Sequence, residues 1–407
     1  MTQHPSNQTA SRGCVLVGFG EALAAPESVW SLIDAGFTVH AFVRHGRPPV
    51  LRHCRGVQVT AITSPEVDAG QCVDDLVALR ERIDPVAIFP MDDTAVWVCD
   101  AAHARLVCPV VGPTGEQAAL ALDKRRQMAA AEAAGFAVPT TRSADDAAAL
   151  DEPVRYPVVI KPALAMACRD GRLMRGRHHV CANAAEWQRA VASSRGEGPV
   201  MVQPFVRGVG EGVFGLATPA GVLAFSGHRR VRMMNPAGSG SSACQSQPVD
   251  EATRQCVQRL MTASGWQGLF MVELLCDDTG QRWFMELNGR PWGSMALARR
   301  MGLEYPAWAA RLALDIDDRP EVSEPQDAAE PVLCRHLGRE LVHLLAVLRG
   351  PRSTALTQWP SRWATLRALL RVRRTDAWYN SRPGERRVLF ADAWQTVYSQ
   401  VRKPAKG

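Results

Sequence analysis

The segment FMELNGR (284–290) decides how the chain folds, because polar side chains stand at every second position of an apolar run. Alternate residues of a β-strand point to the same face of a sheet, so these side chains are predicted to face one common site. They are Glu286, Asn288 and Arg290. The run GLFMVELL (268–275) lies just upstream and carries Glu273. If the two runs form a hairpin, Glu273 lies beside Glu286.

An oxygen-rich face of this kind suits a divalent cation. Two carboxylates and one amide oxygen are hard ligands that Mg²⁺ prefers, and Mn²⁺ accepts the same set. Without a cation the carboxylates would repel each other, and one would hold a proton. The alternative is a solvated sheet face with alternating polar residues, which the Pro-Trp-Gly after Arg290 disfavours. The sequence therefore predicts a magnesium site formed by Glu273, Glu286 and Asn288.

Two lysines upstream strengthen the magnesium hypothesis. Lys161 lies in YPVVIKPA (156–163), directly after a run of apolar residues. A lysine inside a buried strand needs an anion or a carboxylate, and a nucleotide phosphate would supply the anion. Lys124, in the helical stretch LDKRRQ (122–127), would by itself be an ordinary surface residue. The alternatives are a buried salt bridge for Lys161 and simple solvation for Lys124.

The composition is that of a globular protein with room for several domains. The chain has 407 residues, of which 46% are hydrophobic and 22% are charged. The N-terminal stretch MTQHPSNQTASRG (1–13) lacks the apolar core of a signal peptide, and no apolar run of about 18 residues predicts a spanning helix. The 11 cysteines form no CxxC pair, which favours reduced thiols over disulfides or a zinc site. We therefore expect a cytoplasmic protein with no membrane partner.

Positive charge is concentrated near the C-terminus. From Arg352 to the end, 12 Lys and Arg residues stand against 3 Asp and Glu residues. Such a segment can meet nucleic acid, an acidic partner or a membrane surface, or it can be a solvated helical face. The last interpretation is favoured, because no aromatic and basic RNA-binding motif accompanies the charge. No nucleic-acid partner is therefore expected.

The first 110 residues alternate short apolar runs with helical patterns, which predicts an open parallel α/β domain. The stretch GFGEAL (18–23) contains only part of a dinucleotide fingerprint, because Leu23 stands where the third glycine belongs. Arg44 and His45 follow the next strand, where an acidic residue would hold a ribose, so a nicotinamide cofactor is disfavoured. Ligands of such sheets lie beyond the carboxyl ends of the strands. That rule predicts one crevice faced by residues 18–21, 44 and 92–94.

Beyond residue 111 the pattern changes to hairpins mixed with helices. A Pro-Gly turn leads into one alanine-rich helix that is broken by Gly135, and residues 212–231 predict a β-hairpin. CRDGRLMRG (168–176) is predicted to form a basic loop, and NPAGSGSSACQS (235–246) a loop rich in glycine and serine. This mixture of elements is typical of an α+β domain and differs from the first 110 residues.

The tail of the chain is predicted to be helical. Apolar residues recur with helical spacing over 339–350 and 362–374. Its tryptophans are interpreted as packing anchors, and they are Trp359, Trp363, Trp378 and Trp394. The tail can cover an acceptor site, pack in a homodimer or recognise a partner, and the sequence does not choose among these roles.

Five segments, in chain order, carry a resemblance to a known family. They are DK (123–124), YPVVIKPA (156–163), VQPFVRG (202–208), VEL (272–274) and MELNGR (285–290). Their combination resembles the ATP-grasp superfamily in its carboxylate–amine ligase branch, which is carbamoyl-phosphate-synthase-like. The implied fold class is α/β and α+β. The resemblance covers about residues 112–318, where it implies a two-lobed ATP-grasp domain, and residues 1–111 match the Rossmann-like pre-ATP-grasp domain that usually precedes it. The tail resembles nothing sharp, and its spacing and charge predict a mainly helical basic C-terminal region (319–407).

The resemblance implies a role for each residue of the nucleotide site. Lys124 and Lys161 would contact the phosphates of ATP, and Lys161 and Arg290 would act on the transferred group. The Mg²⁺ would be held by Glu273, Glu286 and Asn288. The hinge between the lobes would meet the adenine edge through Gln203, Pro204, Phe205 and Val206. The basic loop 168–176 would close over the phosphates.

One departure from the family concerns the ribose. Relatives commonly follow the hinge with Gly and then Glu, the carboxylate that takes the ribose hydroxyls. Here Val209 follows Gly208, and the first acidic residue is Glu211. Either Glu211 takes this role through a shifted register, or the ribose is held in another way.

On the acceptor side, the resemblance points to HRRVRMMNPAGSGSS (228–242). Arg230 and Arg232 share one face of a strand and would bind a substrate carboxylate, whereas Arg229 takes the other face. The loop beside them would contribute Ser239, Gly240 and Ser241.

These features together predict an ATP-dependent ligase. A small carboxylate would attack the γ-phosphate of ATP, and an amine would then displace phosphate from the acyl phosphate to form an amide or peptide bond. The substrates are expected to resemble amino acids. The alternatives are an ATP-grasp carboxylase or phosphotransferase and a non-catalytic ATP sensor. A sensor is disfavoured because the metal ligands are present, and an oxidoreductase because the dinucleotide fingerprint fails.

Overall fold

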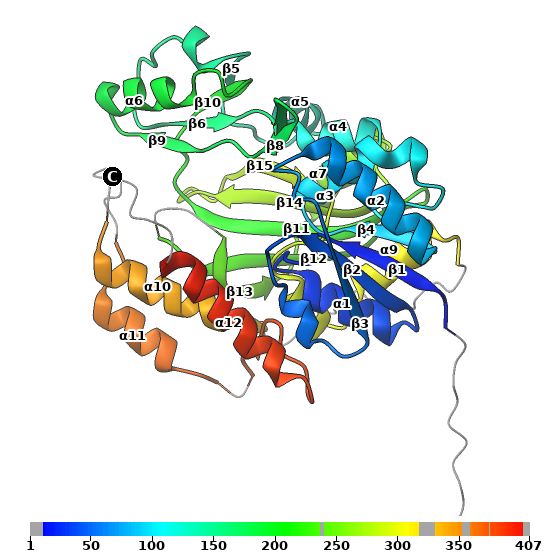
Figure 1. The fold of residues 1–407 in the computed structure, drawn as a ribbon. Helices are drawn as coiled ribbons and strands as arrows, with labels where there is room; N and C mark the ends of the chain where they lie inside the picture. Colours follow the sequence, from blue (N-terminus) through cyan, green and yellow to red (C-terminus); the bar gives the residue numbers. More distant parts are fainter. Residues whose placement is uncertain (1–10, 237–239, 317–329, 352–358, 374, 402–407) are drawn as a thin grey trace, which may run out of the picture.

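The computed structural model describes residues 11–236, 240–316, 330–351, 359–373 and 375–401. They form a four-stranded parallel sheet, a four-stranded antiparallel sheet, a seven-stranded sheet and a two-stranded hairpin. In Figure 1 the antiparallel four-stranded sheet forms one end of the molecule, and the C-terminal helices lie at another. Among the helices described, none combines the length and the hydrophobicity needed to cross a membrane.

The N-terminal domain is the predicted open parallel sheet, with the strand order β3-β2-β1-β4. Its strands are β1 (Cys14–Gly18), β2 (Thr38–Arg44), β3 (Val57–Ile62) and β4 (Ala87–Pro90), and its helices are α1 (Ala25–Asp34), α2 (Ala69–Ile83) and α3 (Asp93–Ala102). Alternate side chains of β1 enter two separate cores. Val15 and Val17 pack with α1, whereas Leu16 packs with α2 and α3. Helices on both faces therefore bury most of β1, β2 and β4, whereas the edge strand β3 stays partly exposed.

The helix predicted after residue 111 is in fact two helices, α4 (Glu116–Leu122) and α5 (Lys124–Ala133). Asp123 separates them with an extended backbone, and its carboxylate caps α5 by accepting a hydrogen bond from the Arg125 N–H. The Lys124 N–H then donates to the Ala163 carbonyl, 2.8 Å away. The break thus joins the start of α5 to the segment that carries Lys161.

We call the antiparallel four-stranded sheet and its helix the small lobe. It is built from β5 (Arg142–Ala144), β6 (Val158–Pro162), β9 (His179–Cys181), β10 (Val200–Pro204) and α6 (Ala184–Ser194). Ile160, Trp187 and Val202 form the centre of its own hydrophobic core. The strand predicted over 198–206 ends at Pro204, so Phe205 and Val206 belong to the connection between the small lobe and the large sheet.

The segment 168–176, predicted to be a loop, forms a two-stranded hairpin of β7 (Ala167–Arg169) and β8 (Arg172–Met174). Its tip lies against the N-terminal domain. The Ala69 N–H donates to the Gly171 carbonyl, and the Leu173 N–H donates to the Pro65 carbonyl. Leu173 is fully buried in the same core as α2 and α3. The apolar Leu173 between arginines explains why this segment packs rather than remaining an irregular loop.

The seven-stranded sheet, called the large sheet below, has the order β15-β14-β11-β12-β13-β16-β17. Its first five strands in the chain are β11 (Val209–Thr218), β12 (Gly221–Met233), β13 (Ser241–Gln247), β14 (Gly268–Cys276) and β15 (Arg282–Asn288). The helices of this part are α7 (Glu251–Ala263), α8 (Met295–Arg300) and α9 (Tyr305–Ala313). The predicted hairpin over 212–231 is confirmed, because β11 and β12 pair up to Thr218 and Gly221.

The predicted glycine- and serine-rich loop over 235–246 is only partly a loop. Its second half forms β13, which pairs with β12 on one side and with β16 on the other. Ala243 and Cys244 are fully buried there. Small side chains such as these suit a central strand that is covered on both faces, and their lack of bulky β-branched residues concealed the strand from pattern analysis.

The C-terminal region is helical, as predicted, but it also completes the large sheet. Its helices are α10 (Leu337–Arg349), α11 (Arg362–Leu370) and α12 (Arg386–Val401), and its strands are β16 (Leu333–Arg335) and β17 (Ala377–Trp378). Because β16 pairs with β13, the region is continuous with the large sheet. The domain boundaries at 111 and 318 stay predictions.

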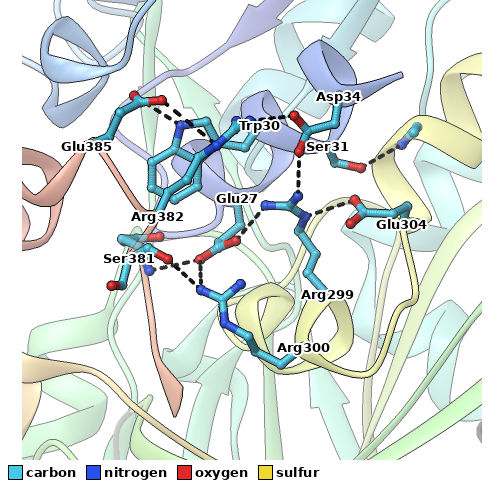
Figure 2. A network of polar contacts seen from close by, with 12 residues as sticks. Glu27, Trp30, Ser31, Asp34, Arg299, Arg300, Glu304, Ser381, Arg382 and Glu385 are labelled. Atoms are coloured by element: carbon cyan, nitrogen blue, oxygen red, sulfur yellow. Dashed lines mark hydrogen bonds and ion pairs between the residues drawn. The ribbon is translucent and has the colours of Figure 1, made fainter. Parts of the chain in front are cut away.

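A polar network fastens the C-terminal region to the N-terminal domain (Figure 2). The buried carboxylate of Glu27, on α1, forms ion pairs with Arg299 and Arg300 of α8. It also accepts a hydrogen bond from the Asn380 N–H. Glu385 accepts hydrogen bonds from the Trp30 indole and from the Arg55 N–H. These contacts fix the relative positions of three parts of the chain.

Candidate active site

The two glutamates of the predicted metal site lie opposite each other. β14 and β15 form an antiparallel pair in which Glu273 faces Glu286, and Asn288 faces Met271. A bulge follows Glu273 and changes the register of the pair beyond it. The hairpin predicted from the sequence is therefore confirmed. The role of the three residues as metal ligands stays a prediction.

Lys124 is brought to this face by the first turn of α5. Its ammonium lies 2.8 Å from the Glu286 carboxylate. The amide of Gln127, one turn further along α5, exchanges two hydrogen bonds of 2.9 Å with the backbone of Leu287. Burial alone would raise the pKa of Glu286, but Lys124 and Arg290 outweigh burial and lower it. Lys124 is thus buried and paired, and the alternative of a solvated surface lysine is wrong.

Lys161 is the least compensated charge in the site. Its side chain is 8% exposed, and it forms no ion pair or hydrogen bond with any described residue. Burial lowers its pKa to about 8, although the nearby Glu286 opposes part of that shift. The alternative of a buried salt bridge is therefore absent from the described part of the chain. A buried ammonium without a partner is stabilised when an anionic ligand binds beside it.

Arg290 is held by groups from two domains. Its Nε lies 2.8 Å from Asp93 Oδ1, and its Nη2 lies 2.7 Å from Asn288 Oδ1. Arg175, at the end of the β7–β8 hairpin, also pairs with Asp93. Burial would raise the pKa of Asp93, but the two arginines lower it well below its usual range. The sequence placed Asp93 in the predicted crevice. It did not reveal that Asp93 pairs with Arg290 and Arg175, because these residues are distant in the chain.

The predicted hinge residues lie between the small lobe and the large sheet. Gln203 is buried, and its amide donates a 2.7 Å hydrogen bond to the Thr141 hydroxyl. Pro204 ends β10, and the Phe205 N–H donates to the Pro157 carbonyl, whereas Val206 lies in the connection. Glu211, the candidate for the ribose, accepts a 2.6 Å hydrogen bond from Arg282. No contact with a nucleotide tests these roles.

A cavity of about 610 Å³ opens between the N-terminal domain, the large sheet and α10. The crevice predicted at the carboxyl ends of the parallel strands is largely present, because Glu21, Arg44 and residues 92–94 line the cavity. Arg44 pairs with Glu21, Glu66 and Asp92, and it also stacks on Phe19. One oxygen of Glu21 and one of Glu66 have no hydrogen-bond partner. We call this side of the cavity the acidic pole.

Arginines from the large sheet and from α10 also line the cavity, and we call this part of its wall the basic pole. Arg230 lies in the cavity wall and pairs with Glu273 at 2.7 Å. Arg339, from α10, lines the same wall beside Gly240 and Ser241. It donates to the Ser241 carbonyl, and no described carboxylate lies within ion-pair distance. Burial lowers the pKa of Arg339. The sequence did not reveal Arg339, because it lies far beyond the motif segments.

Two predicted acceptor residues are not part of this cavity wall. Arg232 forms a bidentate pair with Glu340, at 2.9 and 2.7 Å, and points toward α10. A register shift in β12 between Arg230 and Arg232 separates their environments, although a regular strand would place them on one face. Ser239 lies outside the described residues. Arg229 hydrogen-bonds to Gln245 at the surface.

The site fits a magnesium nucleotide better than a bare metal ion. In the parts of the chain that the structure describes, no group of three or more His, Cys, Asp and Glu residues could hold a metal. Two glutamates and an amide would leave several coordination positions open, and phosphate oxygens commonly complete the shell of Mg²⁺. The uncompensated Lys161 beside them fits the same phosphates.

Comparisons with known proteins agree with this geometry. A family described as "Carbamoyl-phosphate synthase L chain, ATP binding domain" matches residues 119–212. A formate-dependent phosphoribosylglycinamide formyltransferase from Mycolicibacterium smegmatis is 27% identical over 302 residues, which are 68% of this chain and 69% of the relative. An L-amino acid ligase from Bacillus licheniformis has a similar structure, with a TM-score of 0.57 and 17% identity over 75% of this chain and 77% of that one.

A third similar protein binds the nucleotide that the site suggests. It is an ADP complex of N5-carboxyaminoimidazole ribonucleotide synthetase, with a TM-score of 0.61 and 13% identity over 83% of this chain and 84% of that chain. Fold, site and comparisons support the predicted placement of the chain in the ATP-grasp superfamily, in its carboxylate–amine ligase branch. Enzymes of this class form carbon–nitrogen bonds with ATP and Mg²⁺ and release ADP. The predicted fold class, enzyme class and cofactors are confirmed.

Proposed function

We propose that the protein joins a small carboxylic acid to an amine and couples the reaction to ATP hydrolysis. The carboxylate oxygen would attack the γ-phosphorus of ATP, with ADP leaving, to give an acyl phosphate. The amine would attack the acyl carbon, and inorganic phosphate would leave as the amide forms. The observation that carries this proposal is the buried ammonium of Lys161, which has no ionic partner among the described residues and lies near Glu286 and Lys124. Glu273, which faces Glu286 across the strand pair, also lines the cavity.

The residues of this chain would act by position and charge. Lys124 and Lys161 would bind phosphate oxygens, and Glu273, Glu286 and Asn288 would hold Mg²⁺, which neutralises the phosphate charge when bound. Phosphoryl transfer depends mainly on such alignment and neutralisation. Arg290, held by Asp93 and Asn288, would stabilise charge on the migrating group. Gln203 to Val206 and Glu211 would bind the adenosine.

The polarity of the cavity supports amino-acid-like substrates. Glu21, Glu66 and Asp92 line the cavity around the single guanidinium of Arg44, and this excess of negative charge suits a substrate ammonium. Elsewhere in the cavity wall, Arg230 and Arg339 suit a carboxylate. A molecule with one group of each sign would satisfy both poles at once. Met91, Met166 and Met271 also line the cavity and would receive an apolar side chain.

A second candidate follows from Arg339. Arg339 has no carboxylate partner among the described residues, and a guanidinium binds a phosphate as well as it binds a carboxylate. The amine substrate could therefore be a molecule that carries a phosphate group. The acid would then be small, as in the relatives that are named formate-dependent. A carboxylase would use bicarbonate in place of the acid. We expect the enzyme to act on soluble small molecules in the cytoplasm.

The test is a matrix of acids and amines incubated with ATP and Mg²⁺, with released ADP as the readout. The ligase hypothesis predicts ADP release that requires one acid and one amine together, and an amide detected by mass spectrometry. Release that requires bicarbonate would favour a carboxylase. Binding of ATP with no turnover across a matrix that includes formate, the amino acids and phosphorylated amines would contradict the proposal and favour a sensor.

A further inference from the structure

The C-terminal helices expose an unusual concentration of apolar side chains. Trp363 is 81% exposed and Trp394 is 69% exposed, so the interpretation of these two tryptophans as packing anchors is wrong. Phe390, Trp394 and Tyr398 follow one another at four-residue intervals on α12 and form one stripe. The other large apolar side chains exposed in this region are Leu341, Leu348, Leu370 and Val372.

Helix α11 has almost no packing of its own. Thr365 is its one buried residue, although the helix spans Arg362–Leu370. A helix of this length is not stable in water by itself, and most helices in proteins are stabilised by burying an apolar face. The exposed Trp363 and Leu370 are separated by two turns and lie on one side of α11. The apolar side of α11 is therefore exposed instead of being buried against another element.

The charges around these side chains have one sign. The acidic residues of the region after β16 all point inward and are paired, with exposed side-chain fractions of 4% for Glu340, 1% for Asp376, 9% for Glu385 and 12% for Asp392. The arginines of the same helices and their ends are exposed, and they are Arg349, Arg362, Arg367, Arg371, Arg373, Arg386 and Arg387. Within the described residues from 331 onward, the outer surface is therefore apolar and basic, with no exposed carboxylate.

We propose that this face, formed by α10, α11 and α12 and called the C-terminal face, binds anionic lipid surfaces. Figure 1 shows the three helices grouped at one end of the molecule, below the small lobe. Tryptophan, tyrosine and phenylalanine combined with exposed arginine are typical of helices that lie in the interface of a membrane. Acidic lipid head groups would supply the negative charge that the face lacks.

The observations favour lipid over other occupants. A symmetric dimer places the same patch of both copies in contact, so a second copy would bring arginines against arginines with no carboxylate to pair with them. Nucleic-acid interfaces are strongly polar, and they have no need for the exposed apolar side chains of Trp363 and Leu370 on one side of α11. A fluid apolar phase also needs no matching groove on the protein. This proposal replaces the interpretation of the basic tail as a solvated face.

The test is flotation of the full chain with vesicles of phosphatidylcholine alone and with about one third phosphatidylglycerol added. We expect binding to the anionic vesicles that exceeds binding to the neutral ones by tenfold or more. The double variant F390A/W394A should weaken that binding about tenfold or more, because two buried rings are lost. The double variant R386Q/R387Q should weaken it about thirtyfold, because each basic residue near an anionic surface contributes about fivefold.

Matched controls lie on the small lobe and the N-terminal domain. V107S removes an exposed apolar side chain elsewhere, and R189Q/R195Q removes two exposed arginines from the small lobe, so both should bind vesicles like the wild type. Every variant should keep its melting temperature and its ATP affinity, since none of these residues touches the nucleotide site. Three outcomes would overturn the proposal: no vesicle binding, equal loss in the control variants, or dimerisation or RNA binding lost in F390A/W394A without any vesicle binding.

Discussion

The proposed site has a nucleotide end, at Lys124 and Lys161, and an acceptor end, which is the cavity with the acidic and basic poles. The two ends balance their charges in different ways. At the nucleotide end, Lys161 is buried with no ionic partner among the described residues, and Lys124 pairs with Glu286. At the acceptor end, Arg44 pairs with three carboxylates and Arg230 pairs with Glu273. An uncompensated cation indicates an anionic ligand, whereas a cavity with both signs indicates a ligand with both signs.

The strongest test of this contrast is K161M. Loss of one charged donor to the transferred group should lower ADP release about 10²- to 10³-fold. The melting temperature of the ligand-free protein should stay the same or rise, because a buried charge without a partner is removed. R126M is the matched control, because Arg126, a cation on helix α5, is half exposed and pairs with Glu116. An inactive K161M that is also strongly destabilised would contradict the idea of an uncompensated charge.

A smaller effect is expected at the basic pole. R339A should raise the KM of the substrate about 10- to 100-fold, because it removes hydrogen bonds from a charged donor, while the affinity for ATP stays within twofold. R339K should recover part of that loss. The steady-state kinetics of R349A, an exposed arginine at the end of the same helix, provide the control. An unchanged KM in R339A would remove Arg339 from the acceptor site.

The acidic pole gives a weaker and more specific prediction. E21Q should raise the KM of a substrate that carries an ammonium about tenfold, because the neutral amide no longer attracts the positive charge. The same variant should have little effect on a substrate that lacks the ammonium. E116Q, at an exposed surface site, is the control. Equal losses for both substrates would show that Glu21 supports the fold around Arg44 rather than binding an amine.

The smallest expected effect is a pH dependence. Because burial lowers the pKa of Lys161 to about 8, its ammonium loses a proton as the pH rises through that value. ATP affinity should therefore fall severalfold between pH 7 and 9, and K161R should not show this fall, since arginine stays charged. The stability of the ligand-free protein should change in the opposite direction and rise above pH 8, because the unfolded lysine keeps its proton to a higher pH. Calorimetric titrations and thermal melts across this range measure both trends.

Much of the nucleotide end could be predicted from the sequence. Glu286, Asn288 and Arg290 lie within one strand, and strand periodicity places them on one face. The pairing of Glu273 with Glu286 followed from a short turn between two apolar runs. These are local relationships, and local relationships are what sequence patterns encode.

The acceptor end was much less predictable. Arg339 reaches the cavity only because β16 joins the large sheet beside β13, and the small residues of β13 gave no strand signal. Arg232 was predicted to share the face of Arg230, but a register shift between them directs it to Glu340. The ion pair between Arg290 and Asp93 joins two domains. Each of these features depends on contacts between distant parts of the chain.

The central claim is that Glu286 helps Lys124 and Lys161 to hold one magnesium nucleotide. The most direct measurement is the affinity for ATP, by calorimetry, with and without Mg²⁺ in the wild type and in E286Q. We predict that Mg²⁺ strengthens ATP binding to the wild type by about 10²-fold and that this gain is largely lost in E286Q. An E286Q protein whose ATP affinity responds to Mg²⁺ as the wild type does would contradict the account.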